Sequence, residues 1–406
     1  MGSTANTATE LNGLFKDTWA KKLKNAVPDG VKLYNDVPFI PQEQRTGNLY
    51  HAPIVLGLEH GVTYAGTTDD AFALAPAVSG QIKDATVQGT AMVLRSVLGY
   101  QAAGRAVKAG PQAFESATKF LVGNMMRSIV RRAEVMMWYG QQGLGIVSSI
   151  ASNVLTFTTA SWAPGIWSGA ENMPIEIRNS ADTASRGETF ITAVDFDNRT
   201  ITLNTTPSGT AATDVVWFKT ANGNEFAGVD KIVTNTGSLF GISAATYTLW
   251  KGNTYSAGST ALSFAKIQDA VARAVEKGMD GDATCYVNPR AWADLLNDQA
   301  ALRQYDSSYE TSVAENGARK LRFHSQTGVI NIEPSIFIKE GDAFILQLDN
   351  FVKIGSQEIS FERPNGKGEY FRDLSDAHGL ELRCACDFAL FCDAPGHQVK
   401  INNIVN

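Results

Sequence analysis

The sequence has few charged residues, few cysteines and no long apolar run. Four cysteines in 406 residues are too few for a disulfide scaffold and are typical of a reducing compartment. No apolar run approaches the ~18–20 residues that cross a bilayer. The first residues, MGSTANTATEL, lack the basic and apolar regions of a signal peptide. The net charge of −6 excludes the basic footprint of a tight nucleic-acid binder. We therefore expect a soluble protein made in a cytoplasm.

Motifs that would carry chemistry are also missing. The five histidines show no metal-ligand spacing, and no serine lies in a G-x-S-x-G elbow. Cys384, Cys386 and Cys392 with His397 form the one cluster worth weighing as a metal site. Residues two apart on a strand lie ~7 Å apart, unlike a CxxC zinc knuckle, so small core cysteines are the simpler interpretation. We therefore assign no catalytic residue, no cofactor-binding residue and no metal ligand, and we expect no cofactor.

Two short motifs resemble ligand loops without matching them. Gly140, Gly143 and Gly145 run in the reverse order of the dinucleotide fingerprint and follow a helix instead of a strand. The stretch DFDN at 195–198 begins like a calcium loop but lacks the required glycine and terminal glutamate. It obeys the Asn/Asp turn rule instead, and predicts a hairpin between ETFITAVDF and RTITLN.

The strongest helical signal lies between Pro111 and Tyr139. Apolar residues recur there every three or four positions, which places one stripe on a helix about 44 Å long. Pro111 suits the first helical position, and the glycines from Gly140 onward provide a stop. Gly123 costs about 1 kcal/mol relative to alanine, so we expect a soft point there. The stripe comprises Phe114, Ala117, Leu121, Met125, Ile129, Ala133 and Met136. Alone, this pattern also fits an ordinary long core helix.

The segments before this helix predict appendages that cannot form a core of their own. Residues 9–25 form an amphipathic helix, and the proline-containing stretch 31–45 is extended. Residues 49–98 predict a long two-stranded projection with a loose tip, because two strand-like ends flank a stretch rich in Gly, Thr, Asp and Ala. A hairpin folded back on its own domain is the simpler alternative. An isolated hairpin is marginal in water, so the other interpretation is an arm that reaches a neighbouring subunit.

The segments after the helix predict an α+β body with a β-rich interruption. Residues 152–225 lack helical periodicity and predict a small separate barrel or sandwich. Ser263–Lys277 is a helix ended by Gly278, and a short strand at 284–287 leads through Asn288-Pro289 into a second helix. From Lys320 onward we expect a C-terminal sheet against which the long helix packs. Its strands are LRFHS, SIFIKE, AFILQLD, FVKIG, EISFER and LELRCACDFALFC.

This order of parts resembles the major capsid protein of tailed bacteriophages, which has the Hong Kong ninety-seven type of fold. Four stretches carry the likeness. They are GNLYHAPIVLGLEHGVTY (47–64), EFAGVDKIVTNTGSLFGISAATYTLWKGNT (225–254), CYVNPRAWADLLND (285–298) and LELRCACDFALFCDAPGHQVKINNI (380–404). The likeness spans nearly the whole chain except 152–225, which is typical of an insertion in that family.

The resemblance implies a division of the chain into the parts of that fold. An N-terminal arm occupies 1–46, an extended E-loop hairpin 47–98, and the spine-helix region of the peripheral domain 99–142. The axial domain takes 143–151 and 226–345, the inserted β-rich domain 152–225, and the C-terminal strands of the peripheral domain 346–406. We expect the insertion to face outward.

The resemblance also implies a function in the virion. Copies would form hexamers and pentamers of an icosahedral shell around packaged double-stranded DNA, which is contacted non-specifically and without a membrane. Scaffolding, portal and decoration proteins are the other partners that the family implies, and assembly in the bacterial host cytoplasm is expected. No scaffold-like segment precedes the arm, so we expect scaffolding to be a separate protein or already removed. Gly123 would suit helix straightening during maturation. The arm and the ribbon would find their burial only on sister copies.

Three other interpretations stay open from the sequence. An encapsulin-like bacterial compartment shares the fold, and DNA inside purified particles separates it from a phage shell. An enzyme with a β-rich accessory domain belongs to a different class, and a mass above one megadalton on a sizing column counts against it. A decoration or tail-tube protein is generally smaller and lacks such a long helix.

Overall fold

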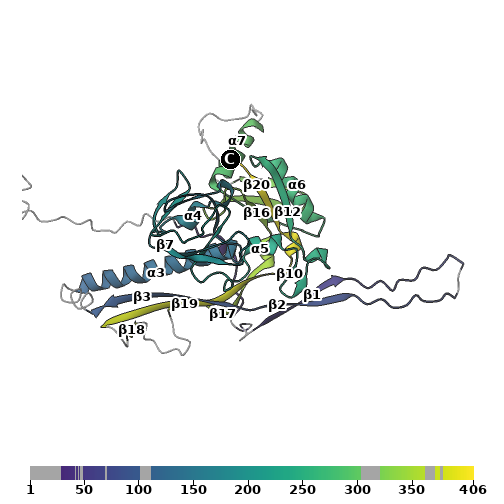
Figure 1. Ribbon diagram of the computed structural model, residues 1–406. Helices are drawn as coiled ribbons and strands as arrows, with labels where there is room; N and C mark the ends of the chain where they lie inside the picture. The colour runs from purple at the N-terminus through teal and green to yellow at the C-terminus, as the bar shows by residue number, and fades with distance from the viewer. Residues whose placement is uncertain are drawn as a thin grey trace, which may run out of the picture.

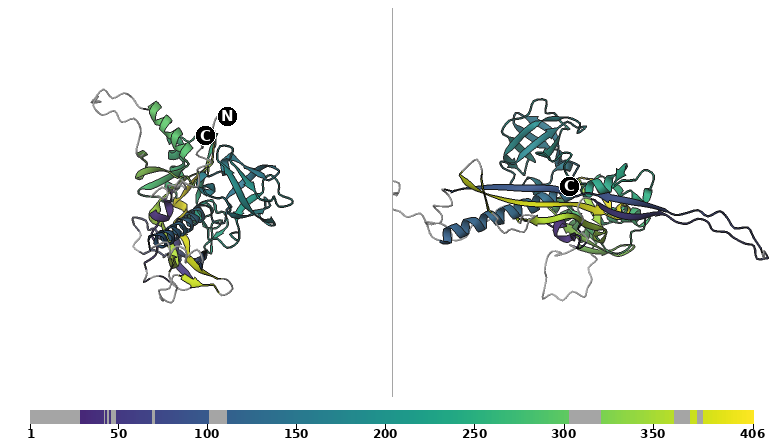
Figure 2. Two further views of the ribbon diagram at one scale, coloured as in Figure 1. Left: turned by 90° about the vertical axis from the view of Figure 1, so that its left-hand side faces the viewer. Right: turned by 90° about the horizontal axis from the view of Figure 1, so that it is seen from below.

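The computed structural model describes residues 29–41, 43, 45, 49–68, 71–100, 111–302, 321–361, 371–374 and 378–406. The helix predicted at residues 9–25 lies outside these ranges. The body combines a long helix on a narrow sheet, a broader sheet covered by helices, and a small barrel set to one side (Figures 1 and 2). The α+β class predicted from the sequence is confirmed.

The long helix α3 (Pro111–Tyr139) has the predicted bounds and packs on a narrow antiparallel sheet. In that sheet β19 (Gly379–Cys392) lies between β3 (Thr90–Gly99) on one side and β17 (Phe351–Ser360) and β18 (Phe371–Asp373) on the other. Met125, Ile129 and Ala133 of the predicted stripe are buried. Side chains at 111–120 are outside the description. Gly123 lies exposed within the continuous helix.

The position of β3 corrects the predicted ribbon. We expected 47–98 to be one projection, but β3 pairs with β19 along its whole length, from Gly99↔Gly379 to Thr90↔Phe388. The ribbon is formed instead by β1 (Tyr50–Gly57) and β2 (Gln81–Val87), which pair antiparallel. Met92 and Leu94 of β3 pack against the main core, and this burial holds the strand on the body.

The predicted small β-domain is a closed barrel. Its strands follow the order β4 (Gly145–Ala151), β5 (Val154–Phe157), β8 (Thr200–Leu203), β7 (Ser185–Asp195), β6 (Pro174–Arg178) and β9 (Val215–Phe218). The short helix α4 (Pro164–Trp167) lies between β5 and β6. The strand at 145–151, which we assigned to the axial domain, belongs to this barrel because Gly145 pairs with Val216 and closes it.

The motif that resembled a calcium loop is the turn of a hairpin, as predicted. Asp195 ends β7 and pairs with Thr200 of β8. The Asp195 carboxylate accepts hydrogen bonds from the backbone N–H of Asp197 at 2.9 Å and of Asn198 at 3.1 Å. Its oxygens therefore close the turn.

The broader sheet has six strands and takes its strands from distant parts of the chain. The order is β12 (Asn253–Thr260), β20 (Val399–Ile404), β16 (Ala343–Leu346), β13 (Ala283–Val287), β15 (Val329–Pro334) and β14 (Leu321–His324). Helices α5 (Val229–Thr234), α6 (Phe264–Val275) and α7 (Pro289–Leu302) accompany it, with the small pair β10 (Ser238–Leu239) and β11 (Ile242–Ser243) nearby. The predicted cap at Asn288 is present, since its side chain accepts from Arg290 N. Ser263, which we placed inside the helix, caps α6 instead by accepting from Lys266 N.

Two expectations for the C-terminal region are wrong. We placed 346–406 in the peripheral domain, but β20 lies between β12 and β16 of the six-stranded sheet. We also expected SIFIKE, 335–340, to be a strand, and it is a series of turns. Phe337 and Ile338 are consecutive and both fully buried, which a strand with alternating faces on one core does not allow. None of the helices described here is long and apolar enough to span a membrane.

Candidate assembly surfaces

The ribbon projects far beyond the body. Past β1 and β2 the two segments 58–68 and 71–80 run side by side into the space beyond the domain (Figures 1 and 2). The N–H of His60 donates to the carbonyl of Val78 at 3.1 Å, and Ala75 N donates to the Thr63 hydroxyl at 2.7 Å. These bonds keep the two segments in antiparallel register. The alternative of a hairpin folded back on its own domain is therefore wrong.

One face of the projecting part of the ribbon carries large apolar side chains, and the opposite face carries small side chains. We call these the apolar face and the small face. In the register of His60 opposite Val78, even-numbered residues share one face, because side chains alternate along an extended chain. The opposite face carries mainly Gly, Ala, Ser and Thr. The apolar face consists of Leu58 (72% exposed), Val62 (62%), Tyr64 (91%), Phe72 (49%), Leu74 (80%) and Val78 (49%), and continues into Val55 and Ile82. Exposed apolar faces of this extent are typical of interaction sites.

The base of the ribbon is fixed to the body. Ala52 and Ala85 are buried on the side that faces the core. The ring of Tyr50 lies edge-on to Phe391 of β19 with centroids 5.7 Å apart, and Thr86 N donates to the carbonyl of Phe240 at 2.9 Å. The base of the ribbon is therefore held on the body, whereas its outer half is not covered by any of the residues described here.

The described part of the N-terminal arm docks on its own chain, which corrects our expectation. The buried carboxylate of Glu134 in α3 accepts from the backbone N–H groups of Leu33 at 3.1 Å and Tyr34 at 2.7 Å. These are the first residues of the short helix α1 (Leu33–Asp36), whose free N–H groups need an acceptor. Trp138 Nε1 donates to the same carboxylate at 2.9 Å. Burial raises the pKa of Glu134, and these four donors, including Lys32 N at 3.3 Å, oppose that rise.

Further contacts extend this docking to the sheet. Lys353 Nζ of β17 donates to the carbonyl of Tyr34 at 2.7 Å, and Ile40 N donates to the carbonyl of Lys353 at 2.8 Å. The Tyr286 hydroxyl donates to Asp36 at 2.6 Å. Residues 33–40 thus bind the spine helix, the narrow sheet and the six-stranded sheet together, so this part of the arm is held by its own chain.

The barrel is anchored to the body by the turns at 335–342. Arg199, at the β7–β8 turn, donates through Nη2 to Glu340 at 2.9 Å and through Nε to both carboxylate oxygens at 3.2 Å. Glu340 is buried, and a bidentate arginine–carboxylate pair is geometrically demanding. The backbone N–H of Gly341 also donates to Ala160 O at 3.1 Å, and a Cβ at Gly341 would lie 2.7 Å from the Ala160 Cβ. The barrel is therefore held directly on the turns that lead into β16 of the six-stranded sheet.

A buried charged cluster joins the end of the spine helix to the same turns. Lys400 of β20 binds Asp230 of α5 at 2.7 Å and Asp342 at 3.1 Å. Burial alone would lower the pKa of Lys400, but the two carboxylates raise it above its usual value. Lys339 donates from Nζ to Gly143 O at 3.0 Å and lies 4.0 Å from the centre of the Tyr139 ring. Burial lowers the pKa of Lys339 to about 8.

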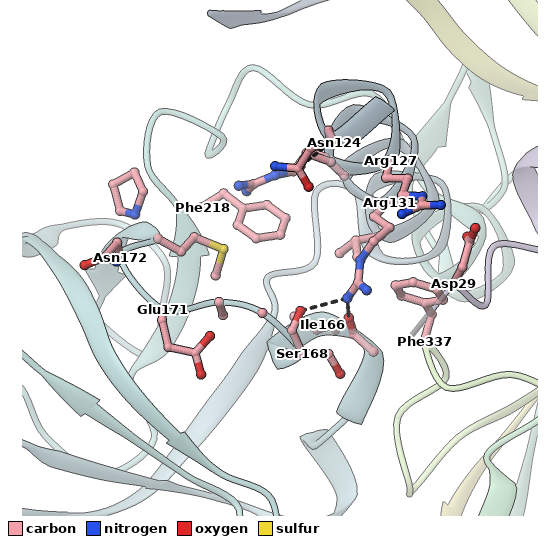
Figure 3. A pocket seen from close by; sticks show the side chains of 18 residues that line it. Asp29, Asn124, Arg127, Arg131, Ile166, Ser168, Glu171, Asn172, Phe218 and Phe337 are labelled. Carbon is pink, nitrogen blue, oxygen red and sulfur yellow. Dashed lines mark hydrogen bonds between the residues drawn. The ribbon is translucent and has the colours of Figure 1, made fainter. Parts of the chain in front are cut away.

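An arginine-rich pocket lies where α3 meets the barrel (Figure 3). Its volume is about 470 Å³. Arg131 donates to the carbonyls of Gly165 at 2.8 Å and Ser168 at 2.9 Å. The guanidinium of Arg132 lies 3.3 Å from the centre of the Phe218 ring, and burial lowers the pKa of Arg132 to about 10. We call this space, with its lining from α3, 165–174 and Phe218, the arginine pocket.

Glu225 lies behind Arg132, and we expect it to make stability depend on pH. Burial raises the pKa of Glu225 to about 7, from 4.5, with opposing effects of the Gln141 N–H and Arg132. Between those values the folded chain keeps a proton that the unfolded chain releases, so stability falls as pH rises through this window. The loss is about 3 kcal/mol at about 1.4 kcal/mol per pH unit.

Urea unfolding of Glu225→Gln across this window tests the prediction. The variant cannot release the proton, so its free energy of unfolding should lack the part of the slope that the wild type shows between pH 4.5 and 7. Glu171→Gln, at an exposed glutamate of the neighbouring pocket, serves as the control and should keep that slope. Equal slopes for wild type and Glu225→Gln would contradict the assignment.

The cysteines weighed as metal ligands are core residues. Cys384, Cys386 and Cys392 are buried on β19, and the Cys384 Sγ lies 3.9 Å from the Met126 Sδ. Burial raises the pKa of each thiol. His397 lies with its ring 3.2 Å from the Asn350 amide. Among the described residues no group of three His, Cys, Asp or Glu side chains is placed to hold a metal.

Sequence reasoning missed the residues that hold the parts together. Glu134, Glu340 and the Lys400 cluster bind partners far away in the chain, so no local pattern reveals them. The one available signal was a charged residue within an otherwise apolar helix turn, as at Glu134 before Val135 and Met136. The arginine pocket had a weak signal of this kind in the run Arg131-Arg132.

Solved structures of other proteins share the fold of this chain, although no sequence match was found. No protein-family model matches the sequence, and no curated protein does either. A solved structure titled as the capsid asymmetric unit of cyanophage A-1(L) superposes with a TM-score of 0.61 at 12% identity, covering 99% of this chain and 100% of that one. The chain has the fold of a phage capsid protein. The capsid of a native GTA particle also matches, with a TM-score of 0.53 at 9% identity over 99% of this chain and 100% of that one. The similarity in fold thus extends over 99% of the chain, whereas the resemblance read from the sequence left out residues 152–225.

Proposed function

We propose that the chain is the major capsid protein of a tailed double-stranded DNA phage. Copies assemble into hexamers and pentamers of an icosahedral shell. The observation that carries this proposal is the exposed apolar face of the projecting ribbon, on a body that has the fold of a phage capsid protein. Repeated contacts in closed rings allow modest interfaces to sum to a stable shell.

The parts of the structure support a specific division of labour. The spine helix and narrow sheet would form the peripheral domain, and the six-stranded sheet the axial domain near the centre of each ring. The barrel, held by Arg199 and Glu340 to one side of the body, would face outward. Its anchor keeps it fixed relative to the axial sheet while the ribbon reaches the next subunit.

The net negative charge of the chain is compatible with a shell that encloses DNA without binding it tightly. A net charge of −6 gives weak attraction for phosphates, so packaged DNA would be held without tight binding. The assembled shell would need no catalysis by this chain. Scaffolding, portal and decoration proteins would be separate partners in the host cytoplasm.

Microscopy of the expressed chain tests the proposal. We expect regular shells by negative stain and a mass above one megadalton on a sizing column. DNA in particles from infected cells supports a phage head, whereas an enzyme cargo would indicate an encapsulin-like compartment. A compact, protease-resistant monomer at high concentration, with the ribbon covered by its own body, would overturn the shell assignment.

A further inference from the structure

The arginine pocket presents positive charge that the described part of the chain does not neutralise. Asn124, Arg127 and Arg131 recur at helical spacing, so α3 turns one polar face toward the space (Figure 3). Arg131 is held by two backbone carbonyls. Arg127, one turn earlier, is exposed to solvent and forms no ion pair with any residue in the described ranges. Its guanidinium is therefore free to bind an anion.

Arg132 is a second guanidinium in the lining, and it is largely buried. Burial lowers the pKa of Arg132 to about 10, and the charge of Glu225 opposes that effect. The two groups are too far apart to form an ion pair, and none of the described residues accepts a hydrogen bond from Arg132. Its one close partner is the ring of Phe218, 3.3 Å from the guanidinium to the ring centre. Buried N–H donors without an acceptor are rare in proteins because they cost free energy, so these donors point to a partner that enters the pocket.

The rest of the lining is apolar, with acidic groups near the edges. Ile166, Met173 and Phe218 supply apolar walls, and the carboxylates of Asp29 and Glu171 lie near the rim (Figure 3). The volume of about 470 Å³ is in the range of pockets that hold small molecules. A bare phosphate ion would leave the apolar walls uncovered, and a strand of linked phosphates would be repelled by the acidic rim. The lining therefore suits a small molecule with one acidic group on an apolar body.

We propose that the arginine pocket binds a small organic anion, whose phosphate or carboxylate group pairs with Arg127 and Arg132 while its apolar body lies against Phe218 and Met173. Guanidinium groups match both acids through parallel N–H donors. The walls come from α3 and from residues 165–174 of the inserted domain, so the bound molecule bridges the spine helix and the barrel segment and stabilises their junction. This site belongs to the folded subunit itself and goes beyond the proposed function.

Titration calorimetry of the full-length chain with phenyl phosphate tests the site. We expect saturable binding of a single molecule per chain. Inorganic phosphate lacks the apolar body and benzyl alcohol lacks the charge, so each should bind about tenfold or more weakly. Benzoate carries a carboxylate in place of the phosphate, and its affinity relative to phenyl phosphate shows which acid the site prefers. No binding of phenyl phosphate or benzoate, or equal binding of benzyl alcohol, would overturn the proposal.

Three substitutions at exposed positions separate the site from general charge effects. Arg127→Gln should weaken phenyl phosphate about tenfold or more, because it removes a charge-assisted hydrogen bond. Glu171→Gln removes a negative charge near the rim and should strengthen binding several-fold. Lys251→Gln, which removes an exposed positive charge outside the pocket, is the matched control and should leave the affinity unchanged. Equal affinities of wild type and Arg127→Gln, or weaker binding by Glu171→Gln, would overturn the site.

Thermal melting gives a second readout and verifies that each variant folds. A ligand that binds only the folded chain raises its melting temperature. Saturating phenyl phosphate should therefore raise the melting temperature of the wild type and of Lys251→Gln, and the same concentration should raise that of Arg127→Gln much less. Equal shifts for all three chains would contradict the pairing. These results are independent of assembly, so shells that form without ligand binding would refute the site alone, and a chain that binds the ligand but forms no shells would refute the proposed function alone.

Discussion

We expect a chain whose residues 58–80 are replaced by two glycines to fold normally and to form no particles. The cut falls just beyond the Gly57–Gln81 pair, so β1, β2 and the buried core of the body stay intact. What disappears is the apolar face of the ribbon, and each large side chain buried in an interface contributes about 1.5–3 kcal/mol. Because every subunit contact in a ring loses this term, assembly should fail completely. Sizing-column mass and thermal melting measure the two parts of the prediction.

Point substitutions separate the apolar face from the ribbon as a whole. Val62→Ser with Leu74→Ser changes the large face and should reduce particle yield strongly. Ala73→Ser with Ala75→Ser makes the same kind of change on the small face and should leave the yield near that of the wild type. Normal shells from the truncated chain, or equal effects of the two double variants, would show that the apolar face does not hold neighbours.

Replacing Glu134 with leucine should lower the free energy of unfolding by about 3 kcal/mol or more. The carboxylate is the acceptor for the first N–H groups of α1 and for Trp138 Nε1, and it is fully buried. Leucine fills similar space but leaves these donors without an acceptor, and each unsatisfied buried donor costs about 1–3 kcal/mol. Urea unfolding of the purified subunit measures the loss.

Glu134→Gln is the matched control for that experiment. The amide keeps one acceptor oxygen in place and should lose only part of the stability. Because α1 is tied to α3 through this side chain, limited proteolysis should also cut the leucine variant near residues 33–40 earlier than the wild type. A loss of stability below about 1 kcal/mol for leucine, or faster cutting of the glutamine variant, would contradict the role of the carboxylate.

Elements with a local signal were predicted well from the sequence. The spine helix has bounds identical to those predicted, because its apolar repeat, first-position proline and terminal glycines all act within a few turns. The barrel was recognised by the absence of helical periodicity and by the turn at 195–198. The helices after Ser263 and Asn288 were set by capping side chains that the structure contains.

Partner strands could not be predicted because pairing is non-local. Thr90–Gly99 has the alternation of a strand, but no local feature of the sequence indicates its partner. It pairs with β19, almost three hundred residues later, and not with β1 as we expected. Val399–Ile404 likewise joins strands on both sides from other parts of the chain. The turns at 335–340 were misassigned since their apolar residues fill a junction, where burial does not alternate.

The residues of the assembly surfaces divide in the same way. The exposed face of the ribbon has a local signal in the period-two alternation of large and small residues at 72–78, which we missed when we described this stretch as a loose tip. The buried charges could not be predicted, because the partners of Glu134, Glu340 and Asp342 are distant in the sequence and come together only in the fold.

The closed barrel makes the chain a natural platform for display. All six strands pair on both sides, so the barrel offers no free edge to an added sequence. Ser208 and Gly209 lie exposed at a turn that Thr210 closes by donating to the Pro207 carbonyl. In the shell proposed above, a foreign epitope grafted between them would be repeated once per subunit at fixed spacing.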